Sequence, residues 1–146
     1  MALVKDLLSK KENQQLWTIA CNASVETALG LMSEKKIGAL IVLDAGEMVG
    51  LFSERDYARK VLTIPDFTLQ TPVHQLMTRR VFYVTPEESA DECMALMTEK
   101  QIRHLPVLDE GILVGMISIG DVVKETLSAM DSRIRELEDY LWLHLI

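Results

Sequence analysis

Two short stretches of the 146-residue chain carry the same small and polar residues at the same spacing. Residues 50–56 read GLFSERD, and residues 115–121 read GMISIGD. A Ser at the start of a helix caps backbone N–H groups, and an acid three residues later favours the positive end of the helix dipole. The same helix start offers free N–H groups to a phosphate. An acid one turn into the helix can also accept hydrogen bonds from ribose hydroxyls, as in dinucleotide-binding folds.

The glycines of these stretches bear on the choice between a helix cap and a nucleotide site. Gly50 and Gly115 lie inside apolar stretches, where Gly weakens a strand unless something approaches the backbone closely. A helix cap alone does not require them. A strand opened by Gly that ends at a Ser-x-x-Asp helix start therefore predicts a nucleotide cleft in each copy. A purely structural capping role remains the alternative.

The two stretches belong to an internal duplication. Residues 17–57 align with residues 82–122 without a gap, and about 15 of 41 positions are identical. A unit of some 60 residues buries only about 60% of its surface, so the two copies are expected to share one core. We expect an α/β (α+β) fold of two pseudo-two-fold-related β-α-β-β-α repeats packed into one module. The predicted segments are a first repeat, a second repeat and a C-terminal helical extension, over residues 1–66, 67–128 and 129–146.

Each copy predicts the same order of elements. Apolar residues at i, i+3, i+4 and i+7 indicate a helix over residues 25–32 and again over residues 90–97. Ser24 and Ser89 are the expected N-caps, and Ser89 with Glu92 fits a capping box. In each copy two apolar runs joined by a short turn with Asp and Gly then predict a hairpin. A second helix is expected to begin at the motif Ser.

Composition and spacing argue against several classes of protein. The net charge of −7 and the pI near 4.9 disfavour a nucleic-acid binder, and charges interrupt every apolar stretch before membrane-span length. Cys21 and Cys93 lie far apart and the start lacks a signal peptide, so a cytoplasmic location is expected. His74, His104 and His144 lack metal-ligand spacing, so no metal is expected. No catalytic triad, carboxylate pair or Walker loop can be assembled, which predicts that the protein is not an enzyme.

At these motifs the chain resembles a tandem pair of cystathionine beta-synthase (CBS) domains, a Bateman module of the short stand-alone type. The resemblance covers nearly all of residues 4–127 and includes the Gly-h-x-Ser/Thr-x-x-Asp pattern in both copies. It also includes an apolar-Pro-Val strand, here Leu105-Pro106-Val107. In that family the Ser or Thr lies at a phosphate and the Asp at a ribose. The strand and the residues before it line an adenine pocket.

The resemblance implies AMP, or ATP or NAD, as the ligand. The ligand-binding residues that it implies are Ile19, Ala20, Gly38, Ala39, Ser53, Arg55, Asp56, Val84, Thr85, Ile102, Arg103, His104, Leu105, Pro106, Ser118 and Asp121. The copies differ in two respects. The first has no Pro in the strand after Gly38, and the second has Gly120 where the first has Arg55. We therefore expect unequal clefts, with Arg55 at the phosphate of the first.

An apolar stripe continues beyond the second copy. Its members recur at three- and four-residue steps and are Leu127, Met130, Ile134, Leu137 and Leu141. The stripe could fold back on its own core or pack against a second chain. The CBS resemblance favours a homodimer, because such pairs form flat four-repeat dimers.

We therefore expect a non-enzymatic regulatory module that senses an adenine nucleotide through dimer or partner geometry. Its partner would be a regulated enzyme or transporter, with no role for nucleic acid or membrane. The alternative is a ligand-free structural dimerisation module.

Overall fold

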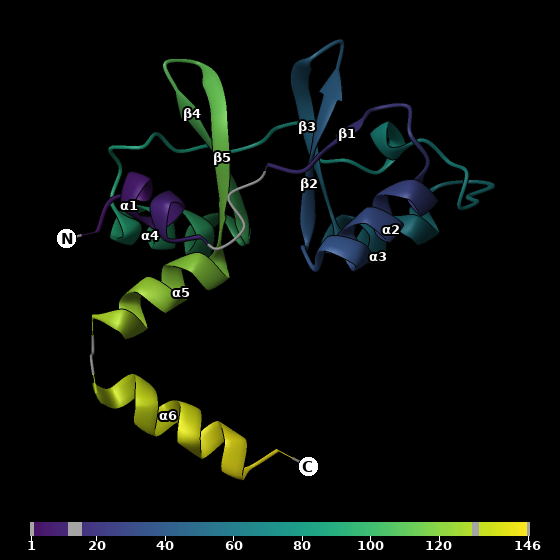
Figure 1. Cartoon of the computed structure of the whole chain (residues 1–146). Coiled ribbons are helices and arrows are strands. Elements are labelled where there is room, and N and C mark those ends of the chain that lie inside the picture. Colours follow the sequence, from purple (N-terminus) through teal and green to yellow (C-terminus); the bar gives the residue numbers. More distant parts are fainter. Residues whose placement is uncertain (1, 12–15, 130–131, 146) are drawn as a thin grey trace. The chain divides into compact units, whose positions relative to one another are not determined.

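A computed structural model of the chain describes most of the sequence (Figure 1). The described backbone covers residues 2–11, 16–129 and 132–145, and the side chains of residues 132–135 are not described.

The chain divides into two compact units. The first-repeat unit consists of residues 15–82, and the second-repeat unit combines residues 1–14 with residues 83–146. The N-terminal segment thus belongs in space to the second repeat. The compact units therefore do not follow the boundary after residue 66 that divides the two sequence repeats.

The first-repeat unit contains a three-stranded sheet and two longer helices. Its elements are β1 (Thr18–Ala20), α2 (Val25–Lys35), β2 (Ala39–Asp44), β3 (Glu47–Ser53), α3 (Glu54–Lys60) and the 3-10 turns η1 (Val61–Thr63) and η2 (Val73–Gln75). The sheet order is β1-β2-β3, with β1 parallel to β2 and β2 antiparallel to β3. The predicted hairpin and its following helix are confirmed.

The second-repeat unit repeats this arrangement around a two-stranded hairpin. Its elements are α1 (Val4–Lys10), α4 (Ala90–Lys100), β4 (His104–Asp109), β5 (Ile112–Ser118), α5 (Ile119–Ser128) and α6 (Ser132–Leu143). A single parallel bridge between Val84 and Val107 stands where the first repeat pairs Ile19 with Val42. In Figure 1 the hairpin of each unit projects from the helices of its own unit. The expected α/β fold of two repeats is therefore confirmed.

The N-terminal caps of α2 and α4 follow the sequence pattern. Ser24 accepts the backbone N–H of Thr27, and Ser89 accepts that of Glu92. The predicted capping box at Ser89 is only half formed. The Glu92 carboxylate accepts the Ser89 hydroxyl at 3.2 Å instead of the Ser89 backbone N–H. Ser89 also lies in an antiparallel bridge with Leu3, in which the Val4 N–H donates to the Glu88 carbonyl and the Ala90 N–H donates to the Ala2 carbonyl.

The described buried apolar residues form one cluster in each unit, so the expectation of a single shared core was wrong. A short helical segment from elsewhere in the sequence completes each cluster. Val4 and Leu7 of α1 are buried among the residues of the second repeat. Val73 and Leu76, from the connector between the copies, are buried in the first-repeat cluster in the same way. The backbone N–H of Val4 donates to the Glu88 carbonyl at 2.8 Å. The connector and the N-terminal segment therefore play equivalent structural parts.

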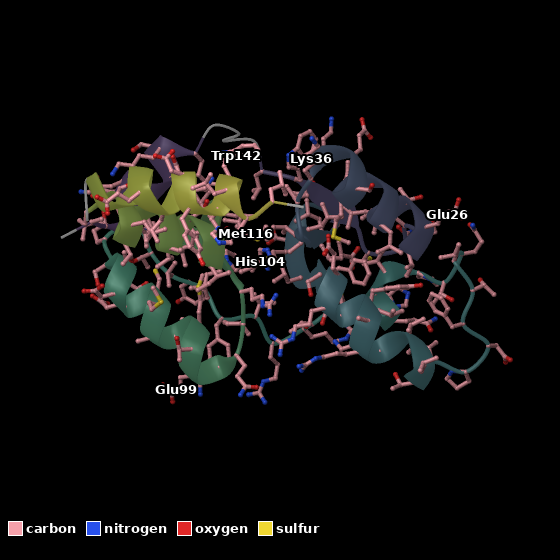
Figure 2. The ribbon with its side chains drawn as sticks, turned by 90° about the horizontal axis from the view of Figure 1, so that it is seen from below. Glu26, Lys36, Glu99, His104, Met116 and Trp142 are labelled. Atoms are coloured by element: carbon pink, nitrogen blue, oxygen red, sulfur yellow. The ribbon has the colours of Figure 1, made fainter. Side chains whose placement is uncertain are left out.

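The C-terminal helix α6 presents apolar side chains to solvent. Leu137 is 48% exposed, Leu141 67% and Trp142 73%, and Figure 2 labels Trp142 on this helix. These side chains are not folded back into a core. Met130 and Ile134 of the predicted stripe lie outside the side chains that the structure describes. None of the described helices has both the length and the apolarity to cross a bilayer.

Candidate functional site

The first motif lies where β3 passes into α3. The Ser53 Oγ caps the helix by accepting the Asp56 backbone N–H at 3.0 Å. The Asp56 Oδ2 accepts the backbone N–H of Ser53 at 2.9 Å and its hydroxyl at 3.0 Å. These reciprocal bonds form a capping box, in which two N–H groups left open by the helix start are satisfied. The helix-capping role expected of Ser53 and Asp56 is therefore present.

Two residues outside the motif contact the other oxygen of Asp56. The Thr78 hydroxyl donates to Asp56 Oδ1 at 2.8 Å, and the Lys60 ammonium lies 3.1 Å from the same oxygen. Lys60 also donates to the carbonyls of Leu76 and Met77, at 3.1 Å and 3.3 Å. Asp56 therefore ties α3 to the segment that follows η2, and its side chain is only 12% exposed.

The second motif, between β5 and α5, repeats the cap but has different neighbours. The Ser118 Oγ accepts the Asp121 N–H at 3.3 Å, and Asp121 Oδ2 accepts the Ser118 N–H at 2.8 Å. The Lys11 ammonium lies 3.0 Å from the same Oδ2 and donates to the carbonyl of Met116, which Figure 2 labels, at 2.8 Å. Next to it, Lys10 pairs with Glu125 at 2.8 Å. The hydrogen bond and the charge of Glu125 raise the pKa of the Lys10 ammonium.

The chain itself fills the space beside both motif glycines. An ideal Cβ at Gly50 would lie 2.7 Å from the Met77 Sδ and 2.7 Å from the Thr78 carbonyl oxygen. One at Gly115 would lie 2.8 Å from the Leu8 Cδ2. A close approach to both glycines is thus found, but the approaching groups belong to the protein. The glycines therefore no longer favour a nucleotide cleft over a helix cap.

The other predicted site residues of the first-repeat unit lie along its strands and helix. Ile19 is buried in β1 while Ala20, next to it, is exposed. The Gly38 carbonyl, just before β2, accepts the Glu54 N–H at 3.0 Å, which joins the strand entry to the start of α3. The two remaining members are Ala39, buried in β2, and Arg55 on α3. The structure brings Gly38 and Ala39 to the motif of their own repeat.

The second-repeat unit gathers its predicted residues around β4. The Arg103 carbonyl accepts the Ile119 N–H at 2.8 Å, so the entry to β4 meets the start of α5. His104, labelled in Figure 2, pairs in register with Ser118. The other members are Val84, Leu105 and Pro106, which are buried, and Thr85 and Ile102, which are partly buried. Ile19 and Ala20 belong to the other unit, and their role as ligand-binding residues stays a prediction.

Sequence reasoning missed three polar residues that contact the motif acids. Lys60 was detectable, since it lies four residues after Asp56, a spacing that pairs opposite charges on a helix. Thr78 and Lys11 carried no local signal, because each contacts an acid far away in the sequence.

Neither a metal site nor a reactive Cys93 thiol has support among the described residues. No group of three or more His, Cys, Asp or Glu could hold a metal ion in the part of the chain that the structure describes. Burial, with the nearby charges of Glu88 and Glu92, raises the pKa of the Cys93 thiol to about 11. A thiol with such a pKa is a poor nucleophile at neutral pH.

The repeated strand-helix motif in two similar α/β units defines the class of this protein. The family model of the CBS domain matches residues 4–63 and 73–128. The chain therefore belongs to the CBS domain family, as the sequence motifs indicated.

Known proteins share both sequence and fold with this chain. The CBS domain-containing protein CBSX3 of Arabidopsis thaliana, named as mitochondrial, is 32% identical over 147 residues, which cover 94% of this chain and 71% of that protein. A solved CBS-domain protein from Burkholderia ambifaria MC40-6 is 47% identical, with a TM-score of 0.84 over 90% of this chain and 96% of its own. The structure of CBSX2 in complex with AMP is 28% identical, with a TM-score of 0.73 over 88% of this chain and 98% of its own.

Proposed function

We propose that this protein is a non-enzymatic regulatory module that binds an adenine nucleotide. AMP is the first choice, and ATP and NAD are the alternatives. The observation that carries this proposal is the likeness to CBSX2, whose structure holds AMP and matches 88% of this chain. The repeated helix start with an acid in its first turn supports the same conclusion.

The motif chemistry suits a nucleoside phosphate. A carboxylate accepts hydrogen bonds from ribose hydroxyls, and a helix start with a Ser hydroxyl offers donors to a phosphate. Partly exposed residues beside the motif, such as Ile102 and His104, offer a surface for a base, whereas Leu105 and Pro106 are buried in β4. The full set of predicted site residues, from Ile19 to Asp121, stays a proposal.

Titration calorimetry of the full chain with AMP, ATP and NAD tests the proposal. We expect saturable binding, strongest for AMP, and native mass spectrometry should show adenine nucleotide that co-purifies with the protein. A protein that binds none of the three and carries no nucleotide would contradict the proposal. It would favour the ligand-free dimerisation module, which the structural roles of the motif glycines and caps also support.

We also propose that the chain forms a homodimer through α6. Leu137 and Leu141 are largely exposed, and an apolar stripe on a soluble protein marks an association surface. The four-residue spacing of these residues suits pairing with an identical helix. Sedimentation should show a dimer that the double variant Leu137→Glu/Leu141→Glu dissociates. Trp142→Ser, which changes an exposed apolar residue off this stripe, is the matched control, and equal dissociation by both variants would contradict a specific interface.

Signalling then requires a partner that responds to occupancy. A regulated enzyme or transporter fits this part, and the proposal includes neither nucleic acid nor membrane. A cytoplasmic location stays a prediction. Incubation with each nucleotide followed by a product assay tests the non-enzymatic part, since conversion of any of them would contradict it.

A further inference from the structure

The two motif acids differ in how much of their hydrogen-bonding capacity the protein uses. An ionised carboxylate offers about four lone-pair positions. Asp56 fills four, because its Oδ1 receives Thr78 and Lys60 while its Oδ2 receives the N–H and the hydroxyl of Ser53. A ligand hydroxyl can reach this carboxylate only by displacing one of these donors.

Asp121 uses only half of its capacity on the residues that the structure describes. Its Oδ2 receives the Ser118 N–H and Lys11, whereas its Oδ1 has no partner among the residues that the structure describes. The side chain is 16% exposed, so solvent reaches it. The Ser118 hydroxyl also differs from that of Ser53, because its hydrogen has no acceptor within the described chain. An open acceptor and an open donor therefore lie together at the start of α5.

Lys60 and Lys11, which contact the two motif acids, also differ in how many of their N–H donors the described protein uses. An ammonium group has three N–H donors. Lys60 has three acceptors within 3.3 Å, namely Asp56 and the carbonyls of Leu76 and Met77. Lys11 has two acceptors in the described structure, Asp121 and the Met116 carbonyl, and is 27% exposed. Among the described residues, one of its N–H groups has no acceptor and so can serve a ligand anion beside Asp121.

We infer that only the second motif binds the ligand and that Lys11, from outside the repeat, is the cation that selects a phosphate-bearing ligand there, while Asp56 is a structural acid. The ribose contact that the family resemblance implies for the motif acid then falls to Asp121 alone. The inference rests on the proposed function and assigns it to one motif. It also reverses the sequence-based expectation that Arg55 of the first motif supplies the phosphate contact. The second motif lacks a basic residue at Gly120, but the N-terminal segment supplies one from outside the repeat.

Calorimetry of the full chain with AMP and with adenosine tests this assignment. Wild type should bind one AMP per chain. Asp121→Asn should weaken AMP about tenfold or more, because it replaces the open acceptor with a donor and removes the charge. The amide nitrogen can take the place of Oδ1, which has no partner to lose, so this variant should keep its fold.

Variants at the first motif should change binding little. Asp56→Asn should keep AMP affinity within about threefold, and so should the milder Thr78→Val, which tests the same network if Asp56→Asn fails to fold. Circular dichroism of each variant establishes folding before titration.

The lysine pair gives a matched test of ligand choice. Lys11→Met should weaken AMP about tenfold and leave adenosine within about threefold, because only AMP brings a charged partner to the ammonium. Lys10→Met is the control, since Lys10 pairs with Glu125 and does not contact Asp121. It should leave both affinities unchanged.

The outcomes separate this inference from the proposed function. Two AMP sites per chain, loss of binding in folded Asp56→Asn or Thr78→Val, or equal losses of AMP and adenosine in Lys11→Met would overturn the inference and keep the function. A wild-type protein that binds neither AMP nor any other adenine nucleotide would overturn both.

Discussion

Lysine and acid exchange places between the two repeats. Lys60 and Glu125 occupy equivalent positions in the duplicated sequence. Lys60 reaches from α3 to the carbonyls of Leu76 and Met77, in the segment whose Thr78 pairs with Leu51 of β3. Glu125 on α5 instead receives Lys10 from α1, the helix whose Leu8 lies beside Gly115 of β5. The segment beside the motif glycine is thus held by a cation on the helix in one repeat and by a cation on the segment in the other.

This exchange shows what the shared motif does and does not determine. Gly allows a neighbouring segment to approach the strand closely, and Ser and Asp cap the helix that follows. They do not determine which donors the Asp receives. Residues outside the motif contribute to this difference: within the described parts of the chain, Asp56 has four donors and Asp121 has two. Two copies of one motif can therefore diverge in function while the backbone stays the same.

The largest expected difference between the repeats concerns the two glycines. Gly50→Ala should lower the free energy of unfolding by about 2–3 kcal/mol, since the added methyl group meets the backbone carbonyl of Thr78, which cannot move away alone. Gly115→Ala should cost about 1 kcal/mol or less, because it meets only the end of the flexible Leu8 side chain. Urea unfolding of both variants measures this. Equal losses of unfolding free energy would show that the neighbours of Gly50 and Gly115 are equally rigid.

A smaller difference is expected for the motif acids. Asp56→Asn should lower stability by about 2 kcal/mol, because the amide turns one oxygen into a donor that faces two donors. Asp121→Asn should cost about 1 kcal/mol or less, since its nitrogen can occupy the unpartnered position. Thermal unfolding without ligand measures both. A larger loss for Asp121→Asn would mean that Lys11 holds this acid more tightly than the contacts indicate.

Local patterns explain why much of the fold was predictable. Helices after Ser24 and Ser89 and the two hairpins depend on periodicity, caps and turns within a few residues. The location of α1 was not predictable, because Val4 and Leu7 carry the same apolar spacing as Val73 and Leu76. Two similar cores accept such a segment equally well on pattern alone. Which core receives it depends on packing over the whole chain.

The candidate site also contains some residues that local patterns predict and others that only the fold brings together. Ser118 and Asp121 were found from spacing, because a cap is a local structure. Lys11 was not found, since it meets Asp121 from 110 residues away in the sequence. The close approach at Gly115 was inferred, but a Gly reveals only that space is needed and not that Leu8 fills it.

The smallest expected effect tests where the repeats remain alike, in their hairpin turns. Both two-residue turns place a non-glycine residue in the left-handed region, with φ of 51° at Ala45 and 49° at Glu110, each followed by a Gly with positive φ. Asn is favoured at this position of such turns, so Ala45→Asn and Glu110→Asn should each raise stability by about 0.5–1 kcal/mol in urea unfolding. Glu110→Gln is the control for the lost charge, because it leaves the backbone preference nearly unchanged. Since the two turns have the same geometry, the gains should be equal once that control is subtracted. A gain in only one repeat would show that the divergence seen at the motif acids extends to the hairpins.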